Sequence, residues 1–493
     1  MLDQLDGSIA DSHGRALLAK GDPAAAVQVI DAGLAALEKA ARAAPSNPII
    51  TAQQAALLRV KFDATGDKAH LTAALAAADR GTKLRGDYWP SALAKSDILD
   101  TMGERTAAVA EVERFVRAAP SNRDGRLRLI DLLAATGKSN RAVEVAREAI
   151  QLSPNDPTWH VALALVLERS GQIDGAIESM ERADRIRPSE EYLARITDLR
   201  LRKDQPNWQA VLASLRVRES VVSRSPYLQA AIGAALANTG DVGGGLQVFR
   251  SSYRAAREAV AQERAEDSII DSWYTCLRLA FPGPRTGEAE KFLYEISDNK
   301  PTTRDLRWIT ELYFATGAPG GAKAIEVAER ALASDDKRDE AITARLYDII
   351  GSVKYGQGDC AGALVAMRMA KNSLAGEPSL LNNFAYLAAE CGNDPSEAVE
   401  AAREANRLAP NQPEFLDTYG FALGQAKRYE EALVQLQDSI RLNPSSSAHM
   451  HMAQVLLAMG RREDASTHVR LAGDLKPDPM IQKRLNELIE KLR

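Results

Sequence analysis

The stretch that decides the fold runs from Pro154 to Pro188 and reads PNDPTWHVALALVLERSGQIDGAIESMERADRIRP. Apolar residues recur in it with the 3.6-residue period of an amphipathic helix, first before Gly171 and again after it. The glycine interrupts the first run and the final proline closes the second. The stretch therefore predicts two helices joined as a hairpin.

Small residues hold a fixed frame within this hairpin. Ala176 and Ala183 follow Gly171 and lie two turns apart on one face of the second helix, where a missing side chain lets the partner helix approach closely. The same frame of glycine, two alanines and proline recurs twice, at Gly137, Ala142, Ala149, Pro154 and at Gly460, Ala465, Ala472, Pro477. Three copies in register predict a repeat array.

The frame resembles the tetratricopeptide repeat (TPR) family, whose unit is a helix-turn-helix of about 34 residues with small residues at the interhelix contacts. Tyr419-Gly420 keeps part of the family's pattern in the first helix. Prolines at the family's spacing of 34 residues are Pro120, Pro154 and Pro188, and also Pro410 and Pro444. The resemblance implies an all-α fold, a right-handed α-solenoid of about 13 TPR-like helical hairpins with a C-terminal capping helix.

Two phrases near the C-terminal end carry a further resemblance. LLNNFAYLAAE, residues 380–390, and FLDTYGFALGQAKRYEEAL, residues 415–433, are similar to TPR proteins of bacterial envelope and exopolysaccharide systems. The similarity covers a small part of the 493 residues. It implies a bacterial source and a role in an assembly complex.

The repeat loses its regularity in the middle of the chain. Pro188 and Pro410 are 222 residues apart, which is not a whole number of 34-residue units, and the pattern is least clear from Asp267 to Pro301. We therefore expect an N-terminal TPR-like solenoid at 1–224 and an irregular helical segment at 225–303. A C-terminal TPR solenoid follows at 304–493, with its capping helix at 479–493.

Charge and hydropathy restrict the partners. The 62 basic and 67 acidic residues give a net charge of −5, so no strong basic field exists to hold nucleic acid. No run of about 18 apolar residues occurs, and we expect no direct insertion into a membrane. The opening MLDQLDGSIADSHG lacks the basic and apolar regions of a signal peptide. This predicts a cytoplasmic protein, with a periplasmic location left open if a leader has been removed.

The residues that could carry catalysis form no recognisable site. Cys276, Cys360 and Cys391 are odd in number and far apart, which argues against a disulfide framework and against a metal pair. His449 and His451 are two positions apart, a spacing that a helix points to different faces. The run GDVGGG, residues 240–245, lacks the lysine and the preceding strand of a phosphate loop. We therefore expect no enzyme activity, no cofactor and no metal.

Candidate binding residues come from the resemblance, because a TPR-like superhelix binds its partners along the concave side that the first helices line. The amides among these residues could hydrogen-bond an extended peptide while the aromatic rings pack against its side chains. An alternative of equal weight is that Asn383 only bonds the adjacent hairpin. The residues expected in the groove are Asn382, Asn383, Tyr386, Asp417, Phe421 and Gln425.

One TPR binding mode is disfavoured by charge. TPR cochaperones that grip the C-terminal carboxylate of heat-shock chaperones use a groove asparagine together with a lysine and an arginine of the next repeat. Asn383 stands at the asparagine position, but the basic positions hold Glu414 and Thr418. A glutamate would repel a terminal carboxylate, so the carboxylate clamp is absent.

The sequence thus favours a non-catalytic TPR scaffold that binds a protein or peptide segment in its concave groove, in the setting of a bacterial assembly complex. One alternative is the non-catalytic targeting part of a larger TPR-fused enzyme. Another is a self-assembling structural solenoid, because open solenoid ends can stack. The oligomeric state stays open.

Overall fold

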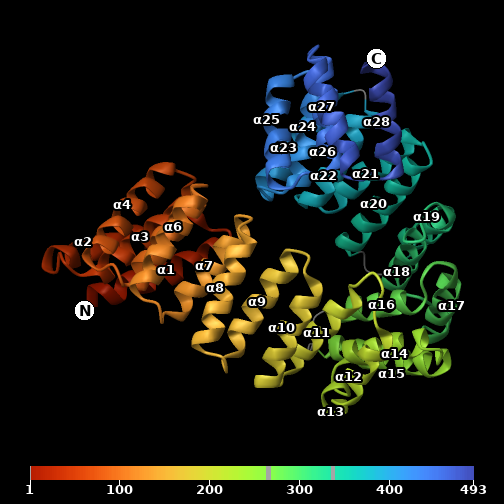
Figure 1. Cartoon of the computed structure of the whole chain (residues 1–493), viewed down its shortest axis with the longest axis horizontal. Helices are drawn as coiled ribbons and strands as arrows, with labels where there is room; N and C mark the ends of the chain where they lie inside the picture. Colours follow the sequence, from red (N-terminus) through yellow and green to blue (C-terminus); the bar gives the residue numbers. More distant parts are fainter. Residues whose placement is uncertain (1, 263–267, 335–338, 393, 493) are drawn as a thin grey trace. The chain divides into compact units, whose positions relative to one another are not determined.

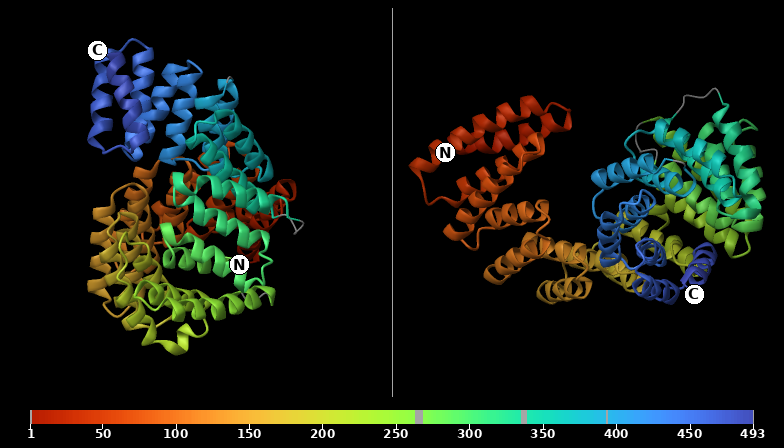
Figure 2. Two further views of the ribbon diagram at one scale, coloured as in Figure 1. Left: turned by 90° about the vertical axis from the view of Figure 1, so that its right-hand side faces the viewer. Right: turned by 90° about the horizontal axis from the view of Figure 1, so that it is seen from above.

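The computed structural model describes residues 2–262, 268–334, 339–392 and 394–492. These residues form 28 α-helices and one short 3₁₀ turn at Gly283–Arg285, with no strand among them. The chain divides into two compact units, Met1–Asn207, called unit 1, and Trp208–Arg493, called unit 2. Within each unit, helices that follow one another in sequence pack as antiparallel neighbours (Figures 1 and 2). The expected all-α solenoid is confirmed.

The helices of unit 1 are α1 Leu2–Ala19, α2 Pro23–Ala43, α3 Pro48–Thr65, α4 Lys68–Leu84, α5 Trp89–Thr101, α6 Arg105–Ala118, α7 Arg123–Ala135, α8 Ser139–Leu152, α9 Pro157–Arg169, α10 Ile173–Ile186 and α11 Glu190–Leu201.

The helices of unit 2 are α12 Trp208–Arg216, α13 Glu219–Val222, α14 Pro226–Asn238, α15 Val242–Ala261, α16 Ser268–Ala280, α17 Thr286–Ile296, α18 Thr303–Phe314, α19 Ala318–Leu332, α20 Glu340–Gly356, α21 Cys360–Ser373, α22 Pro378–Cys391, α23 Pro395–Leu408, α24 Pro413–Gln425, α25 Tyr429–Leu442, α26 Ser446–Ala458, α27 Arg462–Asp474 and α28 Pro479–Leu492.

The hairpin expected at residues 154–188 is formed by α9 and α10. The Asp156 carboxylate accepts the backbone N–H of Thr158, and Pro157 occupies the first turn, where its missing N–H costs nothing. At the other end of α9, Gly171 takes the left-handed conformation with a φ of 75°. Ala176 and Ala183 are fully buried against the partner helix. Local capping and close packing therefore specify the same hairpin.

The irregular middle of the chain is held by aromatic and polar packing in unit 2. The buried Asp305 carboxylate accepts hydrogen bonds from the phenols of Tyr253, at 2.7 Å, and Tyr274. Trp273 donates its indole N–H to Ser252 at 2.9 Å, and its ring packs on both tyrosines. Aromatic rings thus make up much of the packing in this stretch, where the alanine frame is weak.

The helices expected inside this segment are present as α16 and α17. Asp267, where the irregular stretch was expected to begin, lies outside the described residues. The three-part division at 1–224, 225–303 and 304–493 stays a prediction about the regularity of the repeats. The two compact units are defined by a different property, the contacts between residues, so the two divisions do not test each other.

The last helix, α28, packs its apolar side on the preceding hairpin. Leu485 and Leu488 are buried in a cluster with Met450 of α26 and Val469 of α27. Most of its other side chains are exposed. The helix thus covers apolar surface of α26 and α27 that would otherwise face water. We retain the role of a cap as a proposal for residues 479–493, of which Arg493 lies outside the described residues.

Across the described ranges, none of the helices combines the length and the apolar character needed to cross a membrane.

The turn after α20 supplies a test of the backbone constraint. Gly358 has a φ of 84°, whereas Gly356, two residues earlier, is the last helical residue of α20. Neither position would crowd an added Cβ atom. We expect Gly358→Ala to lower the free energy of unfolding by about 1–2 kcal/mol, because a left-handed conformation is costly for alanine. Gly356→Ala should raise it by about 0.5–1 kcal/mol.

Urea denaturation followed by circular dichroism would measure both changes. Equal effects of the two substitutions would show that the left-handed turn does not determine this hairpin.

Candidate functional site

Side-chain bridges join the first helices of successive hairpins in unit 2. In each bridge an acidic residue on the earlier helix faces a hydrogen-bonding group on the later helix. We call this series the polar ladder. Its bridges are Asp271 to Trp308 (3.1 Å), Glu311 to Arg345 (3.3 Å), Asp348 to Asn383 (3.1 Å) and Asp417 to both Ser447 (2.7 Å) and His451 (2.8 Å).

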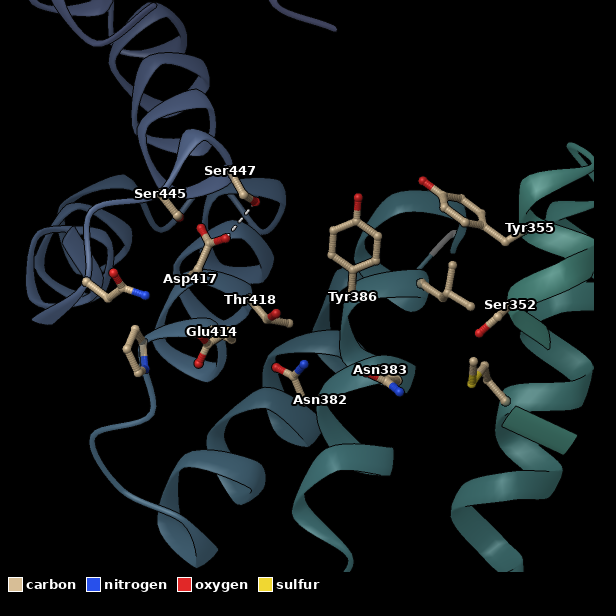
Figure 3. Close-up of a pocket in the computed structure, with 14 residues that line it drawn as sticks. Ser352, Tyr355, Asn382, Asn383, Tyr386, Glu414, Asp417, Thr418, Ser445 and Ser447 are labelled. Carbon is tan, nitrogen blue, oxygen red and sulfur yellow. Dashed lines mark hydrogen bonds between the residues drawn. The ribbon is translucent and has the colours of Figure 1, made fainter. Parts of the chain in front are cut away.

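An open cavity of about 440 Å³ lies among α20, α22, α24 and α26. We call it the ladder pocket. Figure 3 shows that its walls carry polar and aromatic side chains from all four helices. Tyr355, Asn382, Tyr386 and Glu414 are among the residues that line it. Four first helices thus contribute to one concave surface, as a groove for a partner segment requires.

The ladder pocket brings together four of the six candidate residues: Asn382, Asn383, Tyr386 and Asp417. The other two lie elsewhere. Phe421 is buried, and its ring stacks on that of His451 with centroids 4.3 Å apart. Gln425 is exposed and lines a separate hollow together with Leu488 of α28. Phe421 therefore does not line the ladder pocket and instead packs against His451.

The two neighbouring asparagines have different roles. Asn383 donates its amide N–H to the Asp348 carboxylate of the preceding hairpin, as the alternative interpretation of this residue expected. Asn382 also lines the pocket, and its Oδ1 is buried with no hydrogen-bond partner among the described residues. Asn383 thus has a structural bond, whereas Asn382 offers a free acceptor.

Asp417 is buried and held by α26. Ser447 donates to its Oδ2 at 2.7 Å, and the Nδ1 atom of the buried His451 lies 2.8 Å from its Oδ1 (Figure 3). His449 points to another side of α26, where its Nδ1 lies 2.9 Å from that of His468. The spacing of the two histidines indicated different faces, but it gave no sign of the contact with Asp417.

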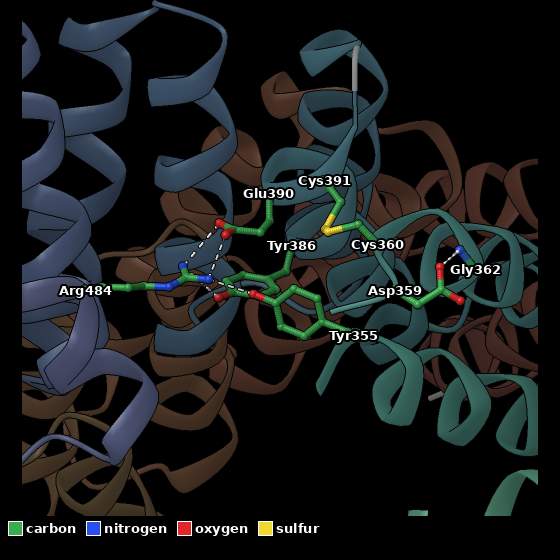
Figure 4. Close-up of a disulfide and its surroundings, with 8 residues drawn as sticks. All are labelled: Tyr355, Asp359, Cys360, Gly362, Tyr386, Glu390, Cys391 and Arg484. Carbon is green, nitrogen blue, oxygen red and sulfur yellow. Dashed lines mark hydrogen bonds and ion pairs between the residues drawn. A yellow bond between two sulfur atoms is a disulfide. The ribbon is translucent and has the colours of Figure 1, made fainter. Parts of the chain in front are cut away.

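Arg484 of α28 reaches the rim of the ladder pocket. Its guanidinium donates to the hydroxyls of Tyr355, at 2.7 Å, and Tyr386, at 3.3 Å, and it pairs with both carboxylate oxygens of Glu390 (Figure 4). Burial raises the pKa of the Tyr386 phenol well above its ordinary value, so the group stays protonated. Sequence reasoning missed this contact because 98 residues separate Arg484 from Tyr386.

The expectation of no disulfide is wrong for one pair. Cys360 and Cys391 are bonded, with their Cα atoms 5.5 Å apart, whereas Cys276 is buried and takes no part in this disulfide. The sequence separation of 31 between the bonded cysteines is close to one repeat, so stacking brings the start of α21 beside the end of α22. Figure 4 shows the disulfide beside Glu390 and Tyr386. It ties together the two hairpins that supply this wall of the pocket.

Loss of this crosslink should destabilise unit 2. For a closed loop of 31 residues the chain-entropy estimate is about 3–4 kcal/mol, so Cys391→Ser should lower the melting temperature of the non-reduced protein. Reductant should lower the melting temperature of the wild type and leave that of the variant unchanged. Thiol titration of the wild type in denaturant provides the control. It should detect one reactive thiol before reduction and three after it. Three thiols before reduction would contradict the pairing.

Part of unit 1 matches a known repeat family. Residues 93–157 and 137–191 match the tetratricopeptide repeat family. A 99-residue segment is 31% identical to the TPR repeat-containing thioredoxin TTL4 of Arabidopsis thaliana and 30% identical to its inactive TPR repeat-containing thioredoxin TTL3. Each match covers 20% of this chain and only 14% of the relative.

Solved structures with related folds include YrrB, described as a TPR protein with an unusual peptide-binding site. It is 20% identical, with a TM-score of 0.30 over 39% of this chain and 96% of its own. Naa15/Naa10 bound to HypK-THB is 10% identical, with a TM-score of 0.37 over 98% and 96%. The APC/C hetero-tetramer Cut9–Hcn1 is 16% identical, with a TM-score of 0.35 over 96% and 95%.

Proposed function

We propose that the chain, whose residues 93–191 match the tetratricopeptide repeat family, is a non-catalytic scaffold and that its unit 2 binds an extended segment of a partner protein in the ladder pocket. Tetratricopeptide repeats serve protein–protein interaction, and the pocket is open on the surface that first helices line. A bacterial assembly complex is the setting that we propose for it.

The free Oδ1 atom of Asn382 is the observation that carries this proposal. A buried acceptor without a partner costs roughly 1–3 kcal/mol, and a donor from a bound segment would recover that cost. Tyr355 and Tyr386 line the same pocket and offer aromatic surface for an apolar part of the same segment. A peptide can meet both requirements, because its backbone N–H groups donate hydrogen bonds and its apolar side chains pack against aromatic rings.

The disulfide bears on the compartment. Disulfides such as Cys360–Cys391 persist mainly in oxidising compartments and are rare in the cytosol. We therefore favour an oxidising compartment over the cytoplasmic location that the sequence suggested.

Substitution of Asn382 tests the pocket. In Asn382→Leu the acceptor is lost while the side-chain volume changes little, so binding of the partner should weaken by about tenfold. The matched control is Asn372→Leu, at an exposed position of α21 away from the pocket. The full chain and both variants would be used to capture partners from an extract of the source organism, followed by quantitative mass spectrometry.

The expected result is a set of proteins retained by the wild type and the control and depleted with Asn382→Leu, at unchanged far-ultraviolet circular dichroism. Equal capture by all three proteins would show that the pocket is not the binding site.

A further inference from the structure

Unit 1, taken by itself, contains bridges of the same polarity. There also, the acid lies on the earlier first helix and the basic donor on the later one. The bridges of unit 1 are Asp97 and Asp100 to Arg128, Asp131 to Arg169, and Glu168 to Arg195 and Arg202. Such bridges thus recur from α5 to α11 in unit 1 and from α16 onward in unit 2.

Within the stretch from α16 to α26 of unit 2, one step between successive first helices lacks its bridge. Among the described residues, no hydrogen bond or ion pair joins a side chain of α22 to a side chain of α24, although α20 is bridged to α22 and α24 to α26. The free acceptor of Asn382 lies on α22 at this step. The gap in the ladder and the ladder pocket coincide.

The register of α24 explains the missing bridge. In α20, Arg345 precedes Asp348 by three residues and pairs with it, and in α7 the same spacing relates Arg128 to Asp131. In α24, the residue three positions before Asp417 is Glu414. The position that carries arginine in α7 and α20 therefore carries the opposite charge here.

The charged side chains that line the resulting pocket are all acidic. Among its described lining residues, Glu414 and Asp417 are the only charged ones, and both are acidic. Glu414 is exposed and makes no ion pair within the described part of the chain. The nearby cations are already engaged, Arg345 with Glu311 and Asp348, and Arg484 with Glu390. A ligand that fits this charge pattern must bring a cation.

We propose that the partner supplies the missing bridge as an arginine side chain, whose guanidinium binds Glu414 and the Oδ1 atom of Asn382 between α24 and α22. The proposal rests on the proposed function and names the chemistry of its partner. Figure 3 shows both side chains at the pocket. A guanidinium carries five N–H donors in a plane, so it can serve a carboxylate and an amide oxygen together, which suits this gap better than a lysine ammonium.

The chain itself shows that this wall accepts a guanidinium. Arg484 is bound at the rim by the hydroxyls of Tyr355 and Tyr386 and by both oxygens of Glu390. The same two tyrosines line the ladder pocket. An arginine from the partner would lie beside the same two tyrosines. Glu414 would pair with that arginine as Glu390 pairs with Arg484.

Peptide binding tests this inference. Fluorescence polarisation would measure how tightly the full chain binds each pool of a positional-scanning library of fluorescein-labelled octapeptides. Pools with a fixed arginine should bind most tightly. Replacing that arginine by citrulline, which has a similar shape without the charge, should weaken binding at least about tenfold. Glu414→Gln should cause a loss of similar size. Glu430→Gln, at an exposed glutamate of α25 outside the pocket, is the matched control and should leave binding unchanged.

A second variant places an arginine of the chain itself at the step that lacks a bridge. Glu414→Arg restores the arginine-aspartate spacing of α20 and brings a donor to Asn382, so it should abolish binding of the arginine peptides and raise the melting temperature. Peptides that bind without any preference for arginine, or arginine peptides that bind Glu414→Gln as well as the wild type, would overturn the inference and leave the proposed function standing. No binding by any pool, together with unchanged partner capture by Asn382→Leu, would overturn both.

Discussion

The close contact between the two helices of each hairpin is the constraint on which the rest of the structure depends. A single amphipathic hairpin exposes apolar surface on its outer sides, so it gains stability only when a neighbour covers that surface. Buried alanines such as Ala176 and Ala398 let the helices approach closely. This approach sets the spacing of the hairpins and hence of every side chain on their shared face. In the irregular middle of the chain, aromatic rings such as that of Trp273 also contribute to the stacking.

That spacing explains why polar bridges recur at regular steps. Hairpins that stack in the same way bring corresponding residues of successive first helices within hydrogen-bond distance, and an acid on one helix then meets a donor on the next. Most of these residues are partly exposed, so each bridge contributes modestly to stability. Where the donor is an arginine, as in Asp131 to Arg169 and Glu311 to Arg345, the two charges of the bridge neutralise one another. A step without a bridge is therefore distinct in charge from the rest of that face.

The ladder pocket is stiffened from three sides. His451 and Ser447 hold Asp417, the disulfide ties the end of α22 to the start of α21, and Arg484 fastens the two tyrosines at the rim. Residues that are already in place lose less side-chain entropy when a partner binds. The pocket thus combines a prepared scaffold with an acceptor, Asn382, that is still unsatisfied.

The sequence by itself determined the helical hairpins and their order, because capping prolines, turn glycines such as Gly171 and the alanine frame act over a few residues. It also brought Asn382, Tyr386 and Asp417 into consideration together, since the repeat length relates their positions. Only the tertiary structure decided that Asn383 is bonded and Asn382 free, that Cys360 pairs with Cys391, and that Arg484 reaches Tyr386. These facts depend on how hairpins stack and on contacts across as many as 98 residues, which no local pattern encodes.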